Sequence, residues 1–417
     1  MQAIVLYCIA KTCINSVLKF SKSDVIKNQV GLACVKNEHT IPVIKITPEH
    51  EEAYFTRLAR DISEGQFLDV FENNQSAFPI FRQKFLEYLQ NHGNGKIWKT
   101  NADGLTVLHV VSSLGYDEYV SYFMKMDTGM INKTDSKGNT PLHLASMNGH
   151  LKAGANVNGS DNLGMTPVYY ACTGNRQKIV QLLIENKANI NKSASNDSTP
   201  LHAACEEESF EIVDILLQKG SKVDAQEKSG DTPLHLACRN GNEPIVKLLI
   251  DNNASINAKT KDKMRPFHEA CKHGHRNVID ILLENNGKYY KQNEQGWTGL
   301  FFSCANGYND IVKILLNRKA DVNLTDKDGV TALHVACMNN HKDVVITLLE
   351  KKANINVKDV HGETPLYKAC VNGYIEIVKI LLSNRAKVKI CGTSGLSPID
   401  IAKKKGFSDI VDLLNNA

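Results

Sequence analysis

The chain has 417 residues, 49 Lys and Arg against 45 Asp and Glu, a net charge of +4 and 42% hydrophobic side chains. This hydrophobic content excludes a disordered chain, and the near-balanced charge argues against a dedicated nucleic-acid binder, which has a strongly basic face. The longest apolar run covers eight residues, Ala3 to Ala10, whereas a membrane span needs about 18. We therefore expect a soluble protein with no membrane insertion. At about 150 residues per domain, the length fits two or three domains or one long array.

Residues 1–99 form the first region. The first twenty residues lack the basic start of a secretory signal, and Lys11 ends their apolar stretch, so secretion is not expected. Two segments, 51–62 and 78–89, have apolar residues three or four apart, which is the spacing of one helix face. Two interpretations stay open for this partly helical region. It covers the apolar end of the region that follows, or it forms a separate small docking domain.

A 33-residue period begins near residue 100 and continues to residue 417. Its markers are Thr-Pro or related pairs, and from residue 166 onward every step between them is 33 residues. These pairs are Thr166-Pro167, Thr199-Pro200, Thr232-Pro233, Arg265-Pro266, Thr298-Gly299, Thr331-Ala332, Thr364-Pro365 and Ser397-Pro398. Two earlier pairs, Thr106-Val107 and Thr140-Pro141, lie 34 and 26 residues before the next pair. Ten repeats therefore occupy residues 100–417.

Each repeat predicts two helices followed by a turn. The Thr or Ser hydroxyl caps a helix, and Pro suits its first position because the missing N–H would be unpaired there anyway. This helix ends about two turns later at a glycine such as Gly241, which suits a left-handed C-cap. The second helix has adjacent apolar pairs at helical spacing, as in Ile245-Val246 and Leu249-Ile250. A turn phrase rich in Asp and Gly then returns the chain to the next Thr-Pro pair.

Three parts of the array depart from the pattern. The second repeat lacks seven residues near 150–154, where most of its second helix is missing. Either this loss leaves an exposed groove and a weak joint in the array, or it reflects an error of the gene model or of splicing. Asp197 and Lys263 replace the turn glycine, so we expect other geometry in both turns. The last repeat has a polar outer face, and we expect it to be a C-terminal cap.

The repeated phrases identify a family. Thr140-Pro141-Leu142-His143-Leu144-Ala145 and Thr232-Pro233-Leu234-His235-Leu236-Ala237, in phase at this period, resemble the ankyrin repeat. The resemblance implies an all-α dominated repeat solenoid of stacked helix-turn-helix units with short projecting β-hairpin loops. It also implies a concave face that binds protein partners, and repeats without catalytic activity.

Two residue types recur once per repeat at fixed positions. Cysteines six residues after the cap are Cys172, Cys205, Cys238, Cys271, Cys304, Cys337 and Cys370. Stacked helices lie about 8–10 Å apart, too far for disulfides or for one shared zinc ion, so we interpret these thiols as core side chains in a reducing compartment. Histidines three residues after the cap are His109, His143, His202, His235, His268 and His334. The resemblance implies that they are structural, with hydrogen bonds within and between repeats.

We expect no enzyme, no cofactor and no metal, because the sequence has no phosphate-binding glycine loop, no HExxH, no GxSxG and no CxxC phrase. One basic cluster, His273 and His275 with Lys272 and Arg276, is interpreted as a solvated loop or as a local basic contact. The cytoplasm is the expected location, and the nucleus stays open. We expect a monomer.

The resemblance also implies where a partner binds. In ankyrin repeats the variable outward positions lie around the hairpin tip and just after the small residues of the first helix. Here the residues before three consecutive caps are Met264, Trp297 and Val330, which predicts an apolar strip on the concave face. Flanking positions are Arg239, Lys272, His273 and Met338. Exposed Trp and Arg are frequent binding hot spots, although Trp297 would equally stabilise the array by folding onto the neighbouring hairpin.

The predicted function is a non-enzymatic interaction scaffold or adaptor for a protein partner. The alternative is a regulatory or targeting subunit of a larger assembly, such as a channel or a phosphatase complex. No nucleic-acid partner is expected.

Overall fold

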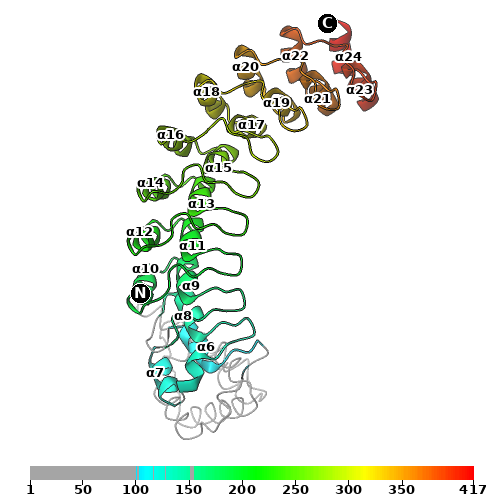
Figure 1. Ribbon diagram of the computed structural model, residues 1–417. Coiled ribbons are helices and arrows are strands. Elements are labelled where there is room, and N and C mark those ends of the chain that lie inside the picture. The colour runs from blue at the N-terminus through cyan, green and yellow to red at the C-terminus, as the bar shows by residue number, and fades with distance from the viewer. Residues whose placement is uncertain (1–99, 101–102, 116, 127, 151–154) are drawn as a thin grey trace, which may run out of the picture. The chain divides into compact units, whose positions relative to one another are not determined.

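The computed structural model describes residues 100, 103–115, 117–126, 128–150 and 155–417 (Figure 1). The two helices expected at 51–62 and 78–89, and the whole expected non-repeat region 1–99, lie outside the described residues. The chain divides into two units, Met1–Ala188 and Asn189–Ala417. The described residues hold nineteen α-helices, and no helix among them is long and apolar enough to cross a membrane.

The first unit contains three helices that begin at the predicted caps, together with their neighbours. The helices at the caps are α6 (Val107–Ser113), α8 (Pro141–Asn148) and α9 (Pro167–Thr173). Helix α7 (Asp117–Met126) follows α6, and α10 (Gln177–Glu185) follows α9. A short 3-10 helix, η2 (Thr128–Asn132), leads from α7 towards α8. We call the helices that begin at the caps inner helices and those that follow them outer helices.

The second unit contains seven complete helix pairs. Its inner helices are α11 (Pro200–Glu206), α13 (Pro233–Asn240), α15 (Pro266–His273), α17 (Gly299–Ala305), α19 (Ala332–Met338), α21 (Pro365–Asn372) and α23 (Pro398–Lys405). Its outer helices are α12 (Phe210–Gln218), α14 (Glu243–Asp251), α16 (Arg276–Glu284), α18 (Asn309–Asn317), α20 (Lys342–Glu350), α22 (Ile375–Ser383) and α24 (Ser408–Asn415). Figure 1 shows that, within this unit, the inner helices form one row and the outer helices a second row. The solenoid of helix pairs is thereby confirmed.

The helix boundaries follow from the capping residues. At Thr331 the hydroxyl accepts the His334 N–H at 3.4 Å, and the backbone around the cap is extended, so the helix begins at the next residue. The predicted left-handed glycines are present at the other end. Gly241, for example, has a φ of 79° and donates its N–H to the Ala237 carbonyl.

The capping histidines confirm their structural role. In five repeats the imidazole Nδ1 lies 2.8–2.9 Å from the cap Thr Oγ1 and also accepts the Thr backbone N–H. Nε2 therefore carries the proton and donates to a carbonyl of the next repeat, as His334 does to Glu363 at 3.1 Å. Each ring thus joins a helix start to the following hairpin.

The core lies between the two helix rows and along the inner row. In α12 the apolar pairs Ile212-Val213 and Leu216-Leu217 are all buried, as their spacing predicts. All seven cysteines of the column are buried with 0% exposure and are free thiols. Their interpretation as core side chains is confirmed. Burial of one Leu or Ile side chain contributes about 1.5–3 kcal/mol to the stability of the fold. Because the core continues from one repeat to the next, each repeat is stabilised mainly by its neighbours.

The hairpins between repeats are shaped by acidic or amide side chains. Asp326 Oδ1 accepts the N–H groups of Asp328 at 2.9 Å and Val330 at 2.8 Å, which closes the turn. The expectation of other geometry at Asp197 and Lys263 is wrong, since both residues adopt left-handed φ values of 64° and 58°. They keep the backbone hydrogen bond that glycine makes elsewhere, because the closing bonds of the hairpin outweigh the strain of a Cβ atom there.

The second repeat has an inner helix but no outer helix among the residues described between α8 and α9. Helix α8 packs directly against α9, so the inner row continues. Leu182 in α10 is 40% exposed, whereas the equivalent residues of later outer helices are buried at Ile281 and Thr347 and half-buried at Ile215, Leu248, Ile314 and Ile380. Thr347 contacts the preceding outer helix through Asn309. Leu182 therefore marks the place where the missing helix would pack.

Candidate functional site

The predicted apolar strip, Met264, Trp297 and Val330, lies where three consecutive hairpins enter the inner helices α15, α17 and α19. All three side chains are half-buried. Their backbone N–H groups are held by the hairpin residues four positions earlier, as in Trp297 N–H to Asn293 Oδ1 at 2.8 Å. The strip is therefore a rigid, repeat-spaced row.

Trp297 is packed tightly within its own repeat and held by the next. Its indole stacks on Phe301 with ring centroids 4.7 Å apart and meets Phe302 edge-on at 5.2 Å. Its Nε1–H donates to Asp326 Oδ2, at 3.1 Å, in the next hairpin. Trp297 thus stabilises the array, whatever else the exposed part of its ring contacts.

Three of the flanking residues are exposed at the ends of inner helices. Lys272 and His273 end α15, and Met338 ends α19 with 38% exposure. The His273 ring stacks on His275 at 6.3 Å. Partial burial lowers the pKa of His273, and Lys272 and His275 add to this effect while Glu269 opposes it. Burial thus favours the neutral form of His273, and its Nε2 lies 3.7 Å from Glu269 Oε2.

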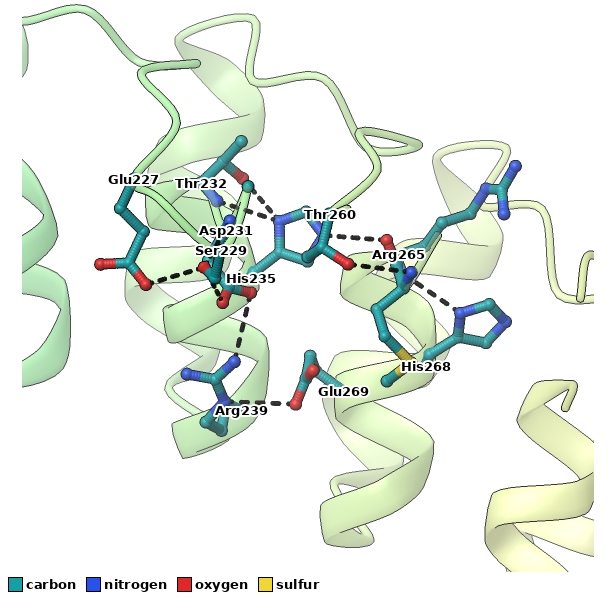
Figure 2. A network of polar contacts seen from close by, with 12 residues as sticks. Glu227, Ser229, Asp231, Thr232, His235, Arg239, Thr260, Arg265, His268 and Glu269 are labelled. Atoms are coloured by element: carbon teal, nitrogen blue, oxygen red, sulfur yellow. Dashed lines mark hydrogen bonds and ion pairs between the residues drawn. The ribbon is translucent and has the colours of Figure 1, made fainter. Parts of the chain in front are cut away.

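Arg239, the fourth flanking residue, is held in an internal network (Figure 2). Its Nη2 lies 3.2 Å from Asp231 Oδ1 and its Nε lies 3.2 Å from Glu269 Oε2. Burial alone would lower the pKa of Arg239, but the hydrogen bonds and charges of Glu269 and Asp231 raise it. Ser229 extends the network, since its Oγ lies 2.7 Å from Asp231 Oδ2 and 3.0 Å from Glu227 Oε1. Arg239 is thus less free to meet a partner than the sequence pattern indicated.

Sequence reasoning missed Glu269 and a second polar cluster of the same kind. Glu269 and Lys368 both stand four residues after a cap, in the slot that holds Leu236 in the repeat before Glu269. Lys368 Nζ lies 2.7 Å from Asp359 Oδ2 and also pairs with Glu363. A charged residue in an apolar slot was the available signal, because such a residue needs a partner from the adjacent hairpin.

The four residues of the basic cluster at the end of α15 have different environments. Lys272, His273 and Arg276 are exposed, but the prediction that they lie on a loop is wrong, since Lys272 and His273 end α15 and Arg276 begins α16. His275 is different, because its Nε2 donates to the Arg239 carbonyl at 2.8 Å and so joins two repeats. His341 makes the same bond to Ala305 at 3.0 Å. The interpretation of His275 as a solvated residue or a local basic contact is wrong, since the close stacking of repeats places its ring against the end of the preceding inner helix.

The buried histidines and cysteines of the two columns lie inside the array. Among the described residues, no three His, Cys, Asp or Glu side chains are grouped so that they could hold a metal ion. Burial raises the pKa of the thiols of Cys172, Cys271, Cys304 and Cys337 and raises that of Cys370 to about 12. What this region of the second unit offers chemically is a rigid surface with an aromatic ring, a thioether and a lysine within reach of solvent.

Comparison with known proteins agrees with this architecture. The family model for ankyrin repeats (3 copies) matches residues 81–156, 151–227, 221–293, 286–359 and 357–417. The chain therefore belongs to the ankyrin-repeat family, whose repeats are generally protein–protein interaction modules and typically non-enzymatic. The count of ten repeats is slightly higher than what is found, since nine inner helices among the described residues have an outer partner. No curated protein matches the chain.

Proposed function

We propose that this protein is a non-enzymatic scaffold or adaptor that binds a protein partner through the inner-helix face of the second unit. The observation that carries the proposal is the exposure of Lys272, His273 and Met338 at the ends of inner helices in the unit that also fixes the ring of Trp297. A fixed aromatic ring at a surface loses little conformational entropy on binding, and an exposed methionine adapts to the shape of a partner. The seven free buried thiols support a cytoplasmic or nuclear location.

A double variant that introduces two glutamates, with a matched control variant, tests this face. The double variant Lys272→Glu, Met338→Glu changes two exposed residues on inner helices. The control, Lys313→Glu, Ile346→Glu, likewise changes one lysine and one exposed apolar side chain to glutamate, on α18 and α20. Capture from lysate by the full chain, with folding checked by circular dichroism, compares the two. We expect at least one protein to bind the intact chain and the control equally and to lose about tenfold or more affinity for the inner-helix variant, which corresponds to about 1.4 kcal/mol. Equal capture by both variants would exclude this face.

Trp297 needs a separate experiment because it serves the fold. Trp297→Ala removes the contacts with Phe301 and Phe302 and the hydrogen bond to Asp326, so we expect a loss of about 2–3 kcal/mol in unfolding free energy. Under conditions where the variant remains folded, its affinity for the captured partner is then measured. Unchanged affinity would remove Trp297 from the binding site and leave it with a structural role.

A further inference from the structure

Arg265 occupies a position at which the other repeats have a capping hydroxyl. The corresponding residues are Thr106, Thr140, Thr166, Thr199, Thr232, Thr298, Thr331, Thr364 and Ser397. Arg has no acceptor atom, so the cap of α15 is limited to the Arg265 N–H, which donates to His268 Nδ1 at 3.1 Å. A residue without a capping hydroxyl lowers the stability of the helix that it precedes. A departure of this kind from the pattern is expected where the side chain serves a function.

The Arg265 side chain is buried without an acidic partner. The residue is 6% exposed, and its Nε has no hydrogen-bond partner. No ion pair to its guanidinium occurs within the described part of the chain, and the group that acts on it electrostatically is the phenol of Tyr290. Burial lowers the pKa of Arg265, but guanidinium stays protonated at every physiological pH. An unpaired charge of this kind is strongly unfavourable unless an anion joins it.

The surroundings of Arg265 supply positive charge and hydrogen-bond donors. Tyr290 is 54% exposed, and Lys291 Nζ lies 4.9 Å from the centroid of its ring. Lys288 on the same loop is exposed. Figure 2 shows the Arg265 side chain extending away from the paired carboxylate of Glu269. The loop therefore presents cations, and no carboxylate of the described residues neutralises Arg265.

Tyr290 is itself a departure from the repeat pattern. The equivalent residue two repeats later is Asn356, which accepts the Lys387 N–H at 2.8 Å, and the equivalent one repeat earlier is Asn257, which accepts the Lys288 N–H at 2.8 Å. These amides tie one loop to the next. Tyr290 cannot make this contact with its ring, and its phenol is left at the surface. His268 links this loop to Arg265, since its Nδ1 accepts the Arg265 N–H at 3.1 Å and its Nε2 lies 2.9 Å from the Lys291 carbonyl oxygen. Arg265 and Tyr290 thus both give up contacts that maintain the array, and both have donors for an anion.

We propose that Arg265, with Tyr290 and Lys291, forms a binding position for an oxyanion carried by an acidic segment of a protein partner. The planar guanidinium suits a carboxylate or a phosphoryl group, which are two sources of the same chemistry. Arg265 and Met264 are consecutive in an extended segment with φ −124° at Arg265, so their side chains point to opposite sides. The oxyanion position is therefore separate from the apolar strip and does not depend on the proposed inner-helix contact.

The first test uses the residue of the other repeats as the substitution. Arg265→Thr restores the usual cap and removes the charge, while Arg276→Thr makes the same change at an exposed residue of α16. Binding of a fluorescein-labelled hexaglutamate peptide to the full chain is followed by anisotropy at constant ionic strength. We expect Arg265→Thr to weaken binding at least tenfold and Arg276→Thr to change it by less than twofold. Equal binding by the intact chain and Arg265→Thr, or no binding by the intact chain, overturns the proposal.

Competition then identifies the source of the anion. Displacement of the peptide by millimolar inorganic phosphate but not by acetate assigns the position to phosphoryl groups, and the opposite result assigns it to carboxylates. Thermal unfolding is the second measurement. Without the peptide, Arg265→Thr is expected to melt at a higher temperature than the intact chain, because it lacks the buried unpaired charge. Saturating hexaglutamate should narrow this difference, and a difference that is unaffected by the peptide contradicts the proposal.

Discussion

Arg239 Nε lies 3.2 Å from Glu269 Oε2, and this contact joins the inner helices α13 and α15. The Glu269 side chain is 5% exposed, so its carboxylate depends on Arg239 for compensation. We expect Arg239→Ala to lower the unfolding free energy by about 1–3 kcal/mol, because a buried carboxylate loses its hydrogen-bonded cation and keeps only His273 Nε2, 3.7 Å from its Oε2. Urea unfolding followed by circular dichroism measures the loss.

A double-mutant cycle separates the pair from other effects of Arg239. Glu269→Leu replaces the carboxylate with the residue found at the equivalent position, Leu236, and the Asp231 contact of Arg239 remains. In the Glu269→Leu background, Arg239→Ala should cost clearly less than it does alone. The same cost in both backgrounds would show that the pair does not stabilise the array.

The fold was readable from the sequence because its determinants are local and repeated. The Thr-Pro pairs, the left-handed glycines and the cysteine column each recur in phase, so the prediction at one repeat supports that at the next. Hairpin closure was harder to predict at Asp197, where a residue with a Cβ atom keeps the glycine conformation. There the hydrogen bonds to neighbouring hairpins fix the backbone. The strength of these hydrogen bonds cannot be predicted from the residues of the turn alone.

The candidate site was less predictable than the fold. Arginine is a frequent residue type in binding hot spots. The side chain of Arg239, however, is held by Glu269, 30 residues later, which lies against it in the stacked array. Trp297 likewise depends on Asp326, 29 residues later. Which side chains remain free thus follows from contacts between repeats. The strip itself, with Met338 and Lys272, stays a prediction that the binding experiments address.

The buried histidines make stability depend on pH. Burial is the main cause that lowers the pKa of His268, to about 4 from an ordinary value of 6.5. Between these two values the unfolded chain binds more protons than the folded chain, so stability is complete above about pH 6.5 and is lost as the pH falls towards 4. A shift of this size corresponds to about 3 kcal/mol. Urea unfolding at a series of pH values from 7.5 to 4.5 should show this decline.

The slot of His268 offers a natural control. Tyr367 occupies the same slot three repeats later, at the start of inner helix α21, where its N–H donates to Thr364 Oγ1 at 3.3 Å. His268→Tyr keeps an aromatic side chain in this slot but removes the Nδ1 acceptor of the Arg265 N–H, so it is expected to lower stability at pH 7.5. It should also show a shallower decline between pH 6.5 and 4.5, because one of the titrating imidazoles is absent. An unchanged slope would mean that His268 does not contribute to the pH dependence.

Thiol reactivity should follow burial. Cys391 is exposed, whereas the seven column cysteines are buried, and burial raises the pKa of those at positions 172, 238, 271, 304, 337 and 370. Because the thiolate is the reactive form, iodoacetamide at pH 7.5 should modify Cys391 within minutes and leave the column unmodified until urea is added. Peptide mass spectrometry gives the extent at each position. Early modification of a column cysteine would reveal local opening of its repeat.

The left-handed backbone at Asp197 predicts a stabilising substitution. At a φ of 64° the Cβ atom of Asp197 is strained against the backbone, and glycine has no Cβ atom. Gly230 occupies the equivalent position one repeat later with a φ of 91°. Asp197→Gly should raise the unfolding free energy by about 1 kcal/mol, whereas Asp197→Ala, which keeps the Cβ atom, should give no such gain. The reverse change, Gly230→Asp, should destabilise the array by more than that, because a Cβ atom there would lie 2.8 Å from Thr260 Cα. Urea unfolding of the three variants checks the sign of each effect, and a gain with Asp197→Ala equal to that with Asp197→Gly would assign the effect to the carboxylate instead of the backbone.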